Sequence, residues 1–131
     1  MIYHKHLLVN AQVTKPMTSA EEGMDFLRQL VHRIDMKILQ GPFATYLDVP
    51  GNRGLTGIVL IETSHIAFHI WDEQNPGLMQ FDLYTCGLLE HKNVLSIIQQ
   101  RFLPTRMEYL LLDREHGFSI EEKITTPYRD Q

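Results

Sequence analysis

The residues that could do chemistry are concentrated in one stretch of the chain, residues 54–87. A serine and a histidine stand next to each other at Ser64 and His65, and a second histidine follows at His69. The only cysteine of the chain, Cys86, lies near the end of the same stretch. Hydroxyl, imidazole and thiol groups are the usual nucleophiles and proton carriers of enzymes. We therefore expect any chemistry that this protein performs to reside in these residues.

Whether His65 and His69 can share a metal ion depends on the local structure. On a helix the two rings would lie on one face, whereas on a strand they would lie about 13 Å apart. The bulky residues between them, Ile66, Phe68 and Ile70, alternate with the histidines and favour a strand. We therefore predict no shared zinc site and no other metal. The simplest interpretation is that each histidine is half-buried and hydrogen-bonded to a neighbour.

A lone cysteine is most often a small buried hydrophobic residue. Here the alternation of the preceding residues places Cys86 on the same side as Asp82 and Tyr84, which is the polar side of a strand. This position favours a functional thiol, which could donate a proton or act as a nucleophile beside an imidazole. The signatures of papain-type cysteine enzymes are absent around it.

The other polar residues of the stretch are less specific. No G-x-S-x-G elbow surrounds Ser64, so the sequence does not favour a serine hydrolase. Asp72 and Glu73 follow Trp71 and would ordinarily form a solvated strand end. Glu73 could also bind the hydroxyl groups of a sugar.

The elements that must position these residues follow from hydrophobic periodicity. Alternating or continuous apolar runs predict six strands, and apolar residues at helical spacing predict two helices. A capping box of the S-x-x-E form, from Ser19 to Glu22, marks the start of the first helix. The predicted strands cover residues 3–13, 37–47, 56–62, 65–71, 78–86 and 106–113, and the predicted helices cover residues 19–34 and 90–102.

This order of elements predicts an α+β fold, a two-layer sandwich in which a mainly antiparallel sheet carries two helices on one face. The other face should carry the histidines and Cys86. Residues 110–112 should be buried in the last strand. The strand at residues 106–113 should be the last element, and we expect the polar tail from Glu115 onward, which contains Pro127, to be mobile. We expect residues 1–131 to form a single domain.

Composition limits the classes of function. The chain has 131 residues, of which 44% are hydrophobic and 21% are charged, and its formal net charge is −4. This mild acidity disfavours nucleic acid as a partner and suits a cationic ligand. One cysteine excludes an intramolecular disulfide and fits a reducing compartment. The apolar run near the N-terminus is too short for a signal peptide, and no run is long enough for a membrane span, so we expect a cytoplasmic location and no membrane partner.

Several short motifs together carry a resemblance to a known family. They are Gly54-Leu55-Thr56-Gly57, Ser64-His65, His69-Ile70-Trp71 with Glu73, and Asp82-Leu83-Tyr84-Thr85-Cys86-Gly87, with a looser match at His6-Leu7-Leu8. In this combination the chain resembles the small prokaryotic S-adenosylmethionine decarboxylases. The combined pattern is far more specific than any one of its parts.

The resemblance implies that the protein makes its own cofactor. Ser64 would attack the carbonyl of Thr63 to form an ester, and β-elimination would then cleave the chain between these two residues. The new end at Ser64 would become a pyruvoyl group, which delocalises charge through a Schiff base to the substrate. By the same resemblance His69 assists this processing, and the hydroxyl of Thr56 helps it.

The resemblance also implies the roles of the remaining site residues. Cys86 corresponds to the acid that returns a proton to the product carbon. Glu73 corresponds to a carboxylate at the substrate site, to which we also assign His65 and Trp71. The family further implies a homodimer with its sites near the subunit interface.

The implied function is decarboxylation of S-adenosylmethionine for the biosynthesis of spermidine and other polyamines. The chain departs from the family pattern at Thr63, where glutamate is usual, at Asp72, where proline is usual, and in a longer loop at residues 72–78. These departures leave two alternatives open. One is a pyruvoyl-dependent decarboxylase of arginine or ornithine, and the other is a ligand-binding homologue that does not process.

Overall fold

The computed structural model describes residues 3–124 of the chain. Neither of the helices in this part is long and apolar enough to cross a membrane. The elements are, in chain order, β1 (Lys5–Val13), α1 (Ala20–Arg33), β2 (Ile38–Leu47), β3 (Gly54–Ile61), β4 (Ser64–Trp71), β5 (Gly77–Thr85), α2 (His91–Phe102), β6 (Pro104–Asp113) and β7 (Ser119–Ile124).

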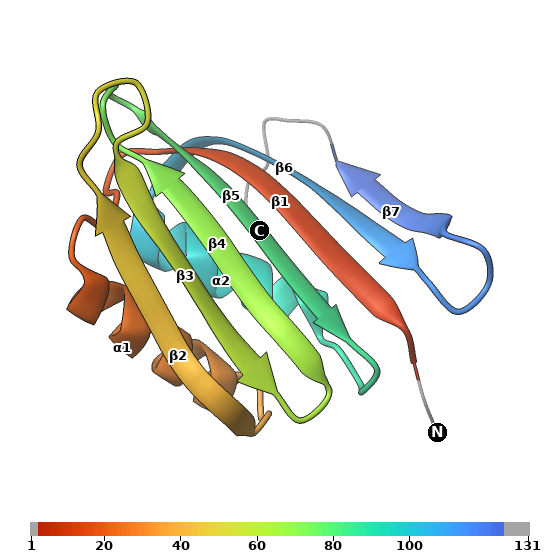
Figure 1. Cartoon of the computed structure of the whole chain (residues 1–131). Coiled ribbons are helices and arrows are strands. Elements are labelled where there is room, and N and C mark those ends of the chain that lie inside the picture. The colour runs from red at the N-terminus through yellow and green to blue at the C-terminus, as the bar shows by residue number, and fades with distance from the viewer. Residues whose placement is uncertain (1–2, 125–131) are drawn as a thin grey trace.

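The seven strands form one sheet in the order β2-β3-β4-β5-β1-β6-β7, and every neighbouring pair is antiparallel. Both helices cover the same face of this sheet, and the other face is open (Figure 1). The predicted α+β sandwich with two helices on one face is therefore confirmed. The first strand, β1, lies inside the sheet between β5 and β6, so the first and last strands, β1 and β7, flank β6.

The core lies between the sheet and the two helices. Alternate residues of β1, β4 and β5 point into it, and the predicted faces of these strands are confirmed. The rings of Phe26 on α1 and Phe102 on α2 meet edge to face at 5.2 Å between their centroids. Phe26 also contacts Phe68 of β4, so one aromatic cluster joins both helices to the centre of the sheet.

The first helix begins as the sequence predicts. The side chain of Ser19 accepts a hydrogen bond from the backbone N–H of Glu22, which satisfies one of the free donors at the helix start. The buried face of α1 includes Phe26 and Leu27, whereas Met24 is only half-buried.

The prediction that no element follows Glu115 is wrong, because β7 pairs with β6 there. Its residues are mostly exposed and polar, so their sequence lacks the apolar alternation by which strands are recognised. An edge strand of this kind is held by backbone hydrogen bonds to one neighbour and buries little. The predicted end of the tail, including Pro127, lies outside the described residues.

The prediction that residues 110–112 are all buried is also wrong. Leu111 is buried, whereas Leu110 and Leu112 are half-buried on the open face. Successive side chains of a strand point to opposite faces of the sheet, and only one face of this sheet is covered by helices.

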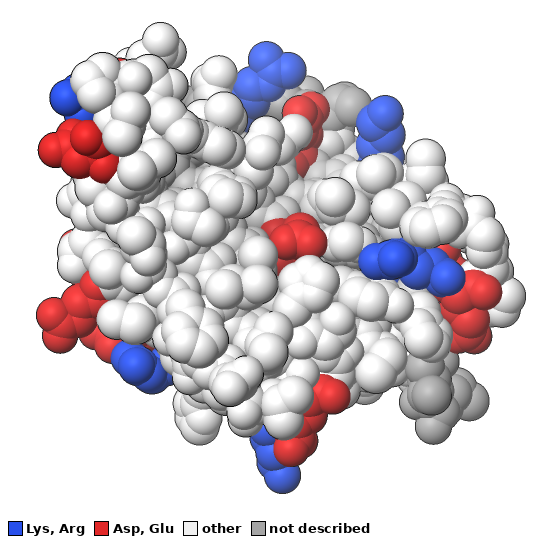
Figure 2. All heavy atoms as spheres, in the orientation of Figure 1, with Lys and Arg blue, Asp and Glu red and all other residues white. Residues whose placement is uncertain are grey.

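The open face is apolar over much of its area. Charged side chains lie mainly around its perimeter, and its middle is largely uncharged (Figure 2). Large hydrophobic residues are exposed on it from four different strands: Leu8, Phe43, Ile58 and Leu78 are each exposed by 36–55%. An apolar surface of this extent is typical of a contact with another molecule.

One glycine of the resemblance motif has a packing role that can be tested. A Cβ atom added to Gly57 would lie 2.6 Å from the buried ring of Phe68, its direct partner on β4. Gly57→Ala should therefore lower the free energy of unfolding by about 1–3 kcal/mol in urea or guanidinium denaturation. A second change, Phe68→Leu, should make the alanine less costly than it is beside phenylalanine, and purely additive effects would contradict this explanation.

Candidate active site

The predicted site residues fall into two groups at opposite ends of β4. Ser64 begins the strand, beside the β3–β4 hairpin and the end of β5. Trp71 ends it, beside the start of β3 and the loop that leads to β5. In Figure 1 these ends lie at the bottom and the top of the sheet. We describe them as the serine end and the tryptophan end.

At the serine end the structure brings Ser64 and Cys86 together through the backbone. Ser64 pairs with Thr85 across β4 and β5, and the backbone N–H of Cys86 donates a hydrogen bond of 2.9 Å to the carbonyl oxygen of Thr63. This carbonyl is the one that the Ser64 hydroxyl would attack. A backbone donor on it would stabilise the negative charge that develops on the oxygen during attack.

The residue before the serine is also held in place. The hydroxyl of Thr85 is fully buried and donates a hydrogen bond of 2.8 Å to the hydroxyl of Thr63. The backbone N–H of Gly87 donates to Thr85 in turn, at 3.0 Å. Thr63 thus takes part in a short chain of hydrogen bonds that fixes the turn before Ser64.

The backbone at Ser64 is strained. Its φ angle is 147°, in a region that residues with a side chain rarely adopt. Such a conformation costs about 1–3 kcal/mol and persists where the surrounding structure enforces it. Here the pairing of Ser64 with Ile61 and Thr85 on both sides enforces it.

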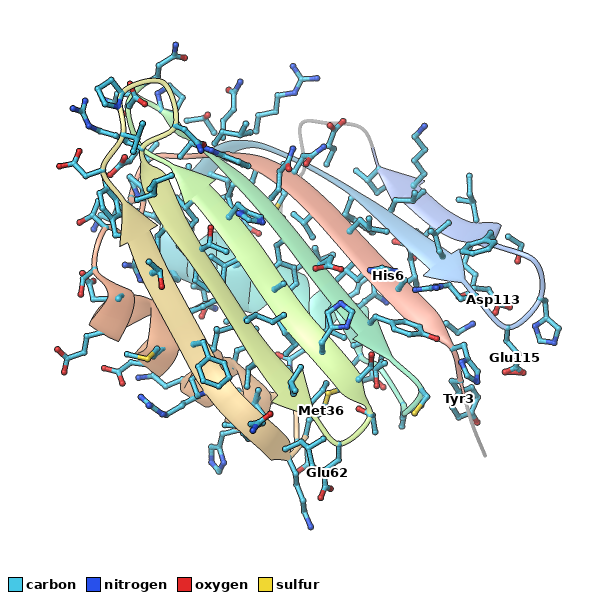
Figure 3. All side chains as sticks on the ribbon, viewed as in Figure 1. Tyr3, His6, Met36, Glu62, Asp113 and Glu115 are labelled. Carbon is cyan, nitrogen blue, oxygen red and sulfur yellow. The ribbon has the colours of Figure 1, made fainter. Side chains whose placement is uncertain are left out.

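His65 connects the serine to a polar cluster on the open face. Its Nδ1 lies 3.3 Å from the Ser64 hydroxyl, and its Nε2 lies 3.3 Å from a carboxylate oxygen of Asp82. His6 of β1 contacts the same oxygen through its Nε2 at 2.8 Å. Figure 3 shows His6 towards the lower right of the sheet, where β1 begins. The prediction that His65 is half-buried and hydrogen-bonded to its neighbours is confirmed, whereas the prediction that His69 is half-buried is wrong, because its side chain is exposed on the open face.

The carboxylate at the centre of this cluster is ionised. Burial alone would raise the pKa of Asp82, but the hydrogen bonds from His6 and His65 outweigh it and hold the pKa below its usual value. In the part of the chain that the structure describes, these three side chains form a group with their nitrogen and oxygen atoms within 4.8 Å of one another.

At the tryptophan end, His69 and Thr56 form a second pair. A hydrogen bond of 2.9 Å joins the Thr56 hydroxyl to Nδ1 of His69, from adjacent positions of β3 and β4. The His69 ring stacks on the Trp71 ring at 5.5 Å between centroids, and the Trp71 indole donates to Asn52. All four of these residues line a cavity of about 230 Å³.

Glu73 lies beyond the same end of the strand. Its carboxylate accepts a hydrogen bond of 2.9 Å from the backbone N–H of Arg53. The backbone N–H groups of Arg53 and Gly51 lower the pKa of Glu73, so it is anionic at neutral pH. Glu73 and Trp71 line a neighbouring cavity of about 400 Å³, which adjoins the longer loop noted in the sequence.

Within one chain the structure does not bring His69 to Ser64. His69 lies five positions after Ser64 along the extended strand, which corresponds to about 16 Å. Trp71 and Glu73 lie further still from the serine. The two groups of predicted site residues, one around Ser64 and one around His69, are therefore both formed, but they are separate.

The cluster at the serine end includes residues to which the sequence reasoning assigned no role. His6 appeared only as part of a resemblance motif, Asp82 appeared in a motif and beside Cys86 on the polar side of its strand, and Arg114 did not appear at all. Nε2 of His6 and of His65 converge on Asp82 because β1 and β4 both flank β5: His6 and His65 both pair with Tyr84. In three predicted strands these residues occupy the polar positions of the alternation, which indicated that they share a face of the sheet. The order of the strands was needed to show that they are neighbours.

Comparison with known proteins adds an independent finding. The family model described as S-adenosylmethionine decarboxylase matches residues 5–115 of this chain. That range contains every residue of both groups, at the serine end and at the tryptophan end.

Individual relatives agree with this match. A protein of Archaeoglobus fulgidus is 28% identical over 115 residues, which cover 87% of this chain and 99% of the relative. A protein of Sulfurihydrogenibium sp. is 36% identical over 102 residues, covering 70% of this chain and 74% of the relative. A third, of Thermoplasma acidophilum, is 51% identical over 35 residues, 27% of this chain and 25% of the relative. All three are named S-adenosylmethionine decarboxylase proenzyme.

Proposed function

Because this chain belongs to the S-adenosylmethionine decarboxylase family, we propose that it cleaves itself at Ser64 and then decarboxylates S-adenosylmethionine. The product would feed the synthesis of spermidine and other polyamines. The observation that carries the proposal is the contact between the Cys86 backbone N–H and the Thr63 carbonyl, next to a strained serine. This arrangement suits an attack of the serine on the preceding peptide bond.

The residues at the serine end fit a pyruvoyl group made from Ser64. Its hydroxyl is part-buried and hydrogen-bonded, and the bond that must break lies in a turn fixed on both sides. A pyruvoyl carbonyl supplies an electron sink for the charge left when carbon dioxide departs. The chain itself would then position the substrate and return a proton, and we assign the proton to the thiol of Cys86.

We further propose that the active enzyme is a homodimer in which the open faces of two sheets pack together. A twofold axis that lies between the faces and runs across the strands would place the serine end of one chain over the tryptophan end of its partner. His69 and Thr56 of each chain would then serve the partner's Ser64. The exposed apolar residues of the open face support this packing. The separation of about 16 Å within one chain also supports it, because His69 cannot reach the Ser64 of its own chain.

The same arrangement would complete the substrate site. The larger cavity at the tryptophan end offers an aromatic ring, Trp71, and an anionic carboxylate, Glu73. S-adenosylmethionine has a flat adenine ring, ribose hydroxyls and a sulfonium charge. An indole can stack on the ring or contact the cation, and a carboxylate can accept hydrogen bonds from the hydroxyls.

The experiment that tests the proposal is the intact mass of the purified chain, followed by release of labelled carbon dioxide. Two fragments divided between Thr63 and Ser64, the larger with a pyruvoyl end, would support processing. Release from S-adenosylmethionine would support the substrate, whereas release from arginine or ornithine would favour a sister decarboxylase. One uncleaved species after long incubation would instead favour a ligand-binding homologue.

The thiol and the backbone of Cys86 have separable roles, and one substitution tests this. Cys86→Ala should still cleave, because the hydrogen bond to Thr63 comes from the backbone N–H. Its decarboxylation rate should fall by about 100-fold or more, because the proton donor is lost. Both rates can be measured on one preparation, by intact mass and by carbon dioxide release. Turnover at the unmodified rate would contradict the assignment of the thiol.

A further inference from the structure

We propose that His65 is the general base that removes the proton from Ser64 in the first step of self-cleavage, and that Asp82, His6 and Arg114 position it for this role. The inference rests on the proposed function and adds a catalytic residue to it. The sequence resemblance had placed His65 at the substrate instead.

The directions of the hydrogen bonds that His6 makes follow from the cation of Arg114. The guanidinium of Arg114 can only donate, and its Nη1 lies 3.3 Å from Nδ1 of His6. Nδ1 of His6 must therefore accept, which leaves the proton of the neutral ring on Nε2. That Nε2 donates to Asp82 at 2.8 Å. Arg114 also lies over the Tyr84 ring, 4.3 Å from its centroid, which holds the guanidinium in place.

The carboxylate of Asp82 determines which nitrogen of the His65 ring carries the proton. Its Nε2 faces the ionised carboxylate of Asp82 and must donate to it. The neutral ring then has its lone pair on Nδ1, and Nδ1 lies 3.3 Å from the Ser64 hydroxyl. A serine hydroxyl, an imidazole and a carboxylate in this order are the arrangement by which hydrolases activate a serine. Here the roles of the two ring nitrogens are exchanged.

The first step of self-cleavage needs no group from outside the chain. Ser64 gives its hydroxyl proton to Nδ1 of His65 while its oxygen bonds to the carbonyl carbon of Thr63. The Cys86 backbone N–H stabilises the charge on the carbonyl oxygen. The bond from that carbon to the nitrogen of Ser64 then breaks, and His65 returns the proton to this nitrogen. The products are an ester and a free amine, with no electrons gained or lost.

His69 of the same chain cannot take this role, because it lies about 16 Å along the strand. A divalent cation in the cluster is also disfavoured. The two Nε2 atoms that face Asp82 carry protons, and the guanidinium of Arg114 lies against the His6 ring. His69 of the partner remains available for the later elimination, in which the proton on the α-carbon of Ser64 is removed.

The test separates the two steps with hydroxylamine, which cleaves esters but not ordinary peptide bonds. In the full chain, His65→Gln keeps an amide donor for Asp82 but removes the base, so cleavage should slow by about 100-fold or more. Hydroxylamine should not restore it, since the ester does not form. His69→Ala should instead accumulate the ester and be cleaved quickly by hydroxylamine. Added imidazole should partly restore cleavage of His65→Ala.

His4→Ala is the matched control. His4 lies in the same region and is hydrogen-bonded to the Tyr84 hydroxyl, and no bond joins it to Ser64 or Asp82. This variant should cleave at the unmodified rate. If His65→Gln cleaves as fast as the unmodified chain, or forms the ester as fast, the inference is wrong and self-cleavage still stands. If the unmodified chain itself never cleaves, the proposed function is wrong.

The positioning role of Asp82 has its own readout. In the uncleaved Ser64→Ala chain, nitrogen NMR of the His65 ring should show the proton on Nε2 and none on Nδ1. Asp82→Asn removes the charge and allows the opposite arrangement, so the proton should move towards Nδ1 and cleavage should slow. An unchanged His65 signal together with unchanged cleavage would overturn this role of Asp82.

Discussion

Replacing Ser64 with alanine should leave every chain in one piece. The hydroxyl is the only group in the scissile turn that can attack the Thr63 carbonyl and become the new end, so no other residue can substitute for it. Decarboxylation should be lost completely with it, because no pyruvoyl group forms. Intact mass after prolonged incubation measures the first loss, and carbon dioxide release measures the second.

A second substitution at the same position tests whether loss of cleavage comes from misfolding. Alanine and cysteine meet the same backbone strain as serine at a φ of 147°, and both are close to it in size. Ser64→Cys keeps a nucleophile and should form a thioester that hydroxylamine cleaves, whereas Ser64→Ala should resist hydroxylamine. Both should unfold at similar temperatures. Cleavage of Ser64→Ala at the bond between residues 63 and 64 would refute the assignment of Ser64.

A mixed dimer of two inactive chains should regain cleavage in one of them. One chain carries Ser64→Ala and the other carries His69→Ala, each with a different affinity tag, and dimers with both tags are purified. If His69 serves the partner's serine, the His69→Ala chain meets an intact histidine and is cleaved. The Ser64→Ala chain stays whole. Because the tags differ in mass, intact mass identifies which chain has been cleaved.

The opposite geometry gives an opposite result. If His69 acted within its own chain, neither member of the mixed dimer would have both groups, and neither would be cleaved. Unmixed dimers of each variant are the controls: the Ser64→Ala dimer should stay uncleaved, and the His69→Ala dimer should cleave slowly. If neither chain of the mixed dimer is cleaved faster than in these controls, His69 does not act on the Ser64 of the partner chain, whatever the oligomeric state.

Periodicity alone predicted most of the fold. The alternation of Leu7, Val9 and Ala11 located β1 and its buried side, and the capping box at Ser19 located the start of α1. These signals are local, because a side chain's face within a strand or helix depends on its position in that element alone. The strand β7 was missed for the same reason: its stability comes from pairing with β6 and leaves no local pattern.

The sequence likewise predicted the residues of the candidate site but not their arrangement. The residue types and their motifs identified Ser64, His69 and Cys86, and the family match agrees with the family that these motifs suggested. The pairing of the strands then placed Cys86 beside the Thr63 carbonyl and His69 away from Ser64. Spacing along the chain could not decide either point, since it does not give the order of the strands.

The sequence by itself determined which chemical groups this protein possesses and on which side of each strand they lie. Only the tertiary structure decided which of them meet. His6 and Asp82 are 76 residues apart in the chain and in contact in the sheet, because β1 inserts between β5 and β6. The physical reason is that side-chain direction follows from local geometry, whereas contacts between strands follow from how the whole sheet buries its apolar face.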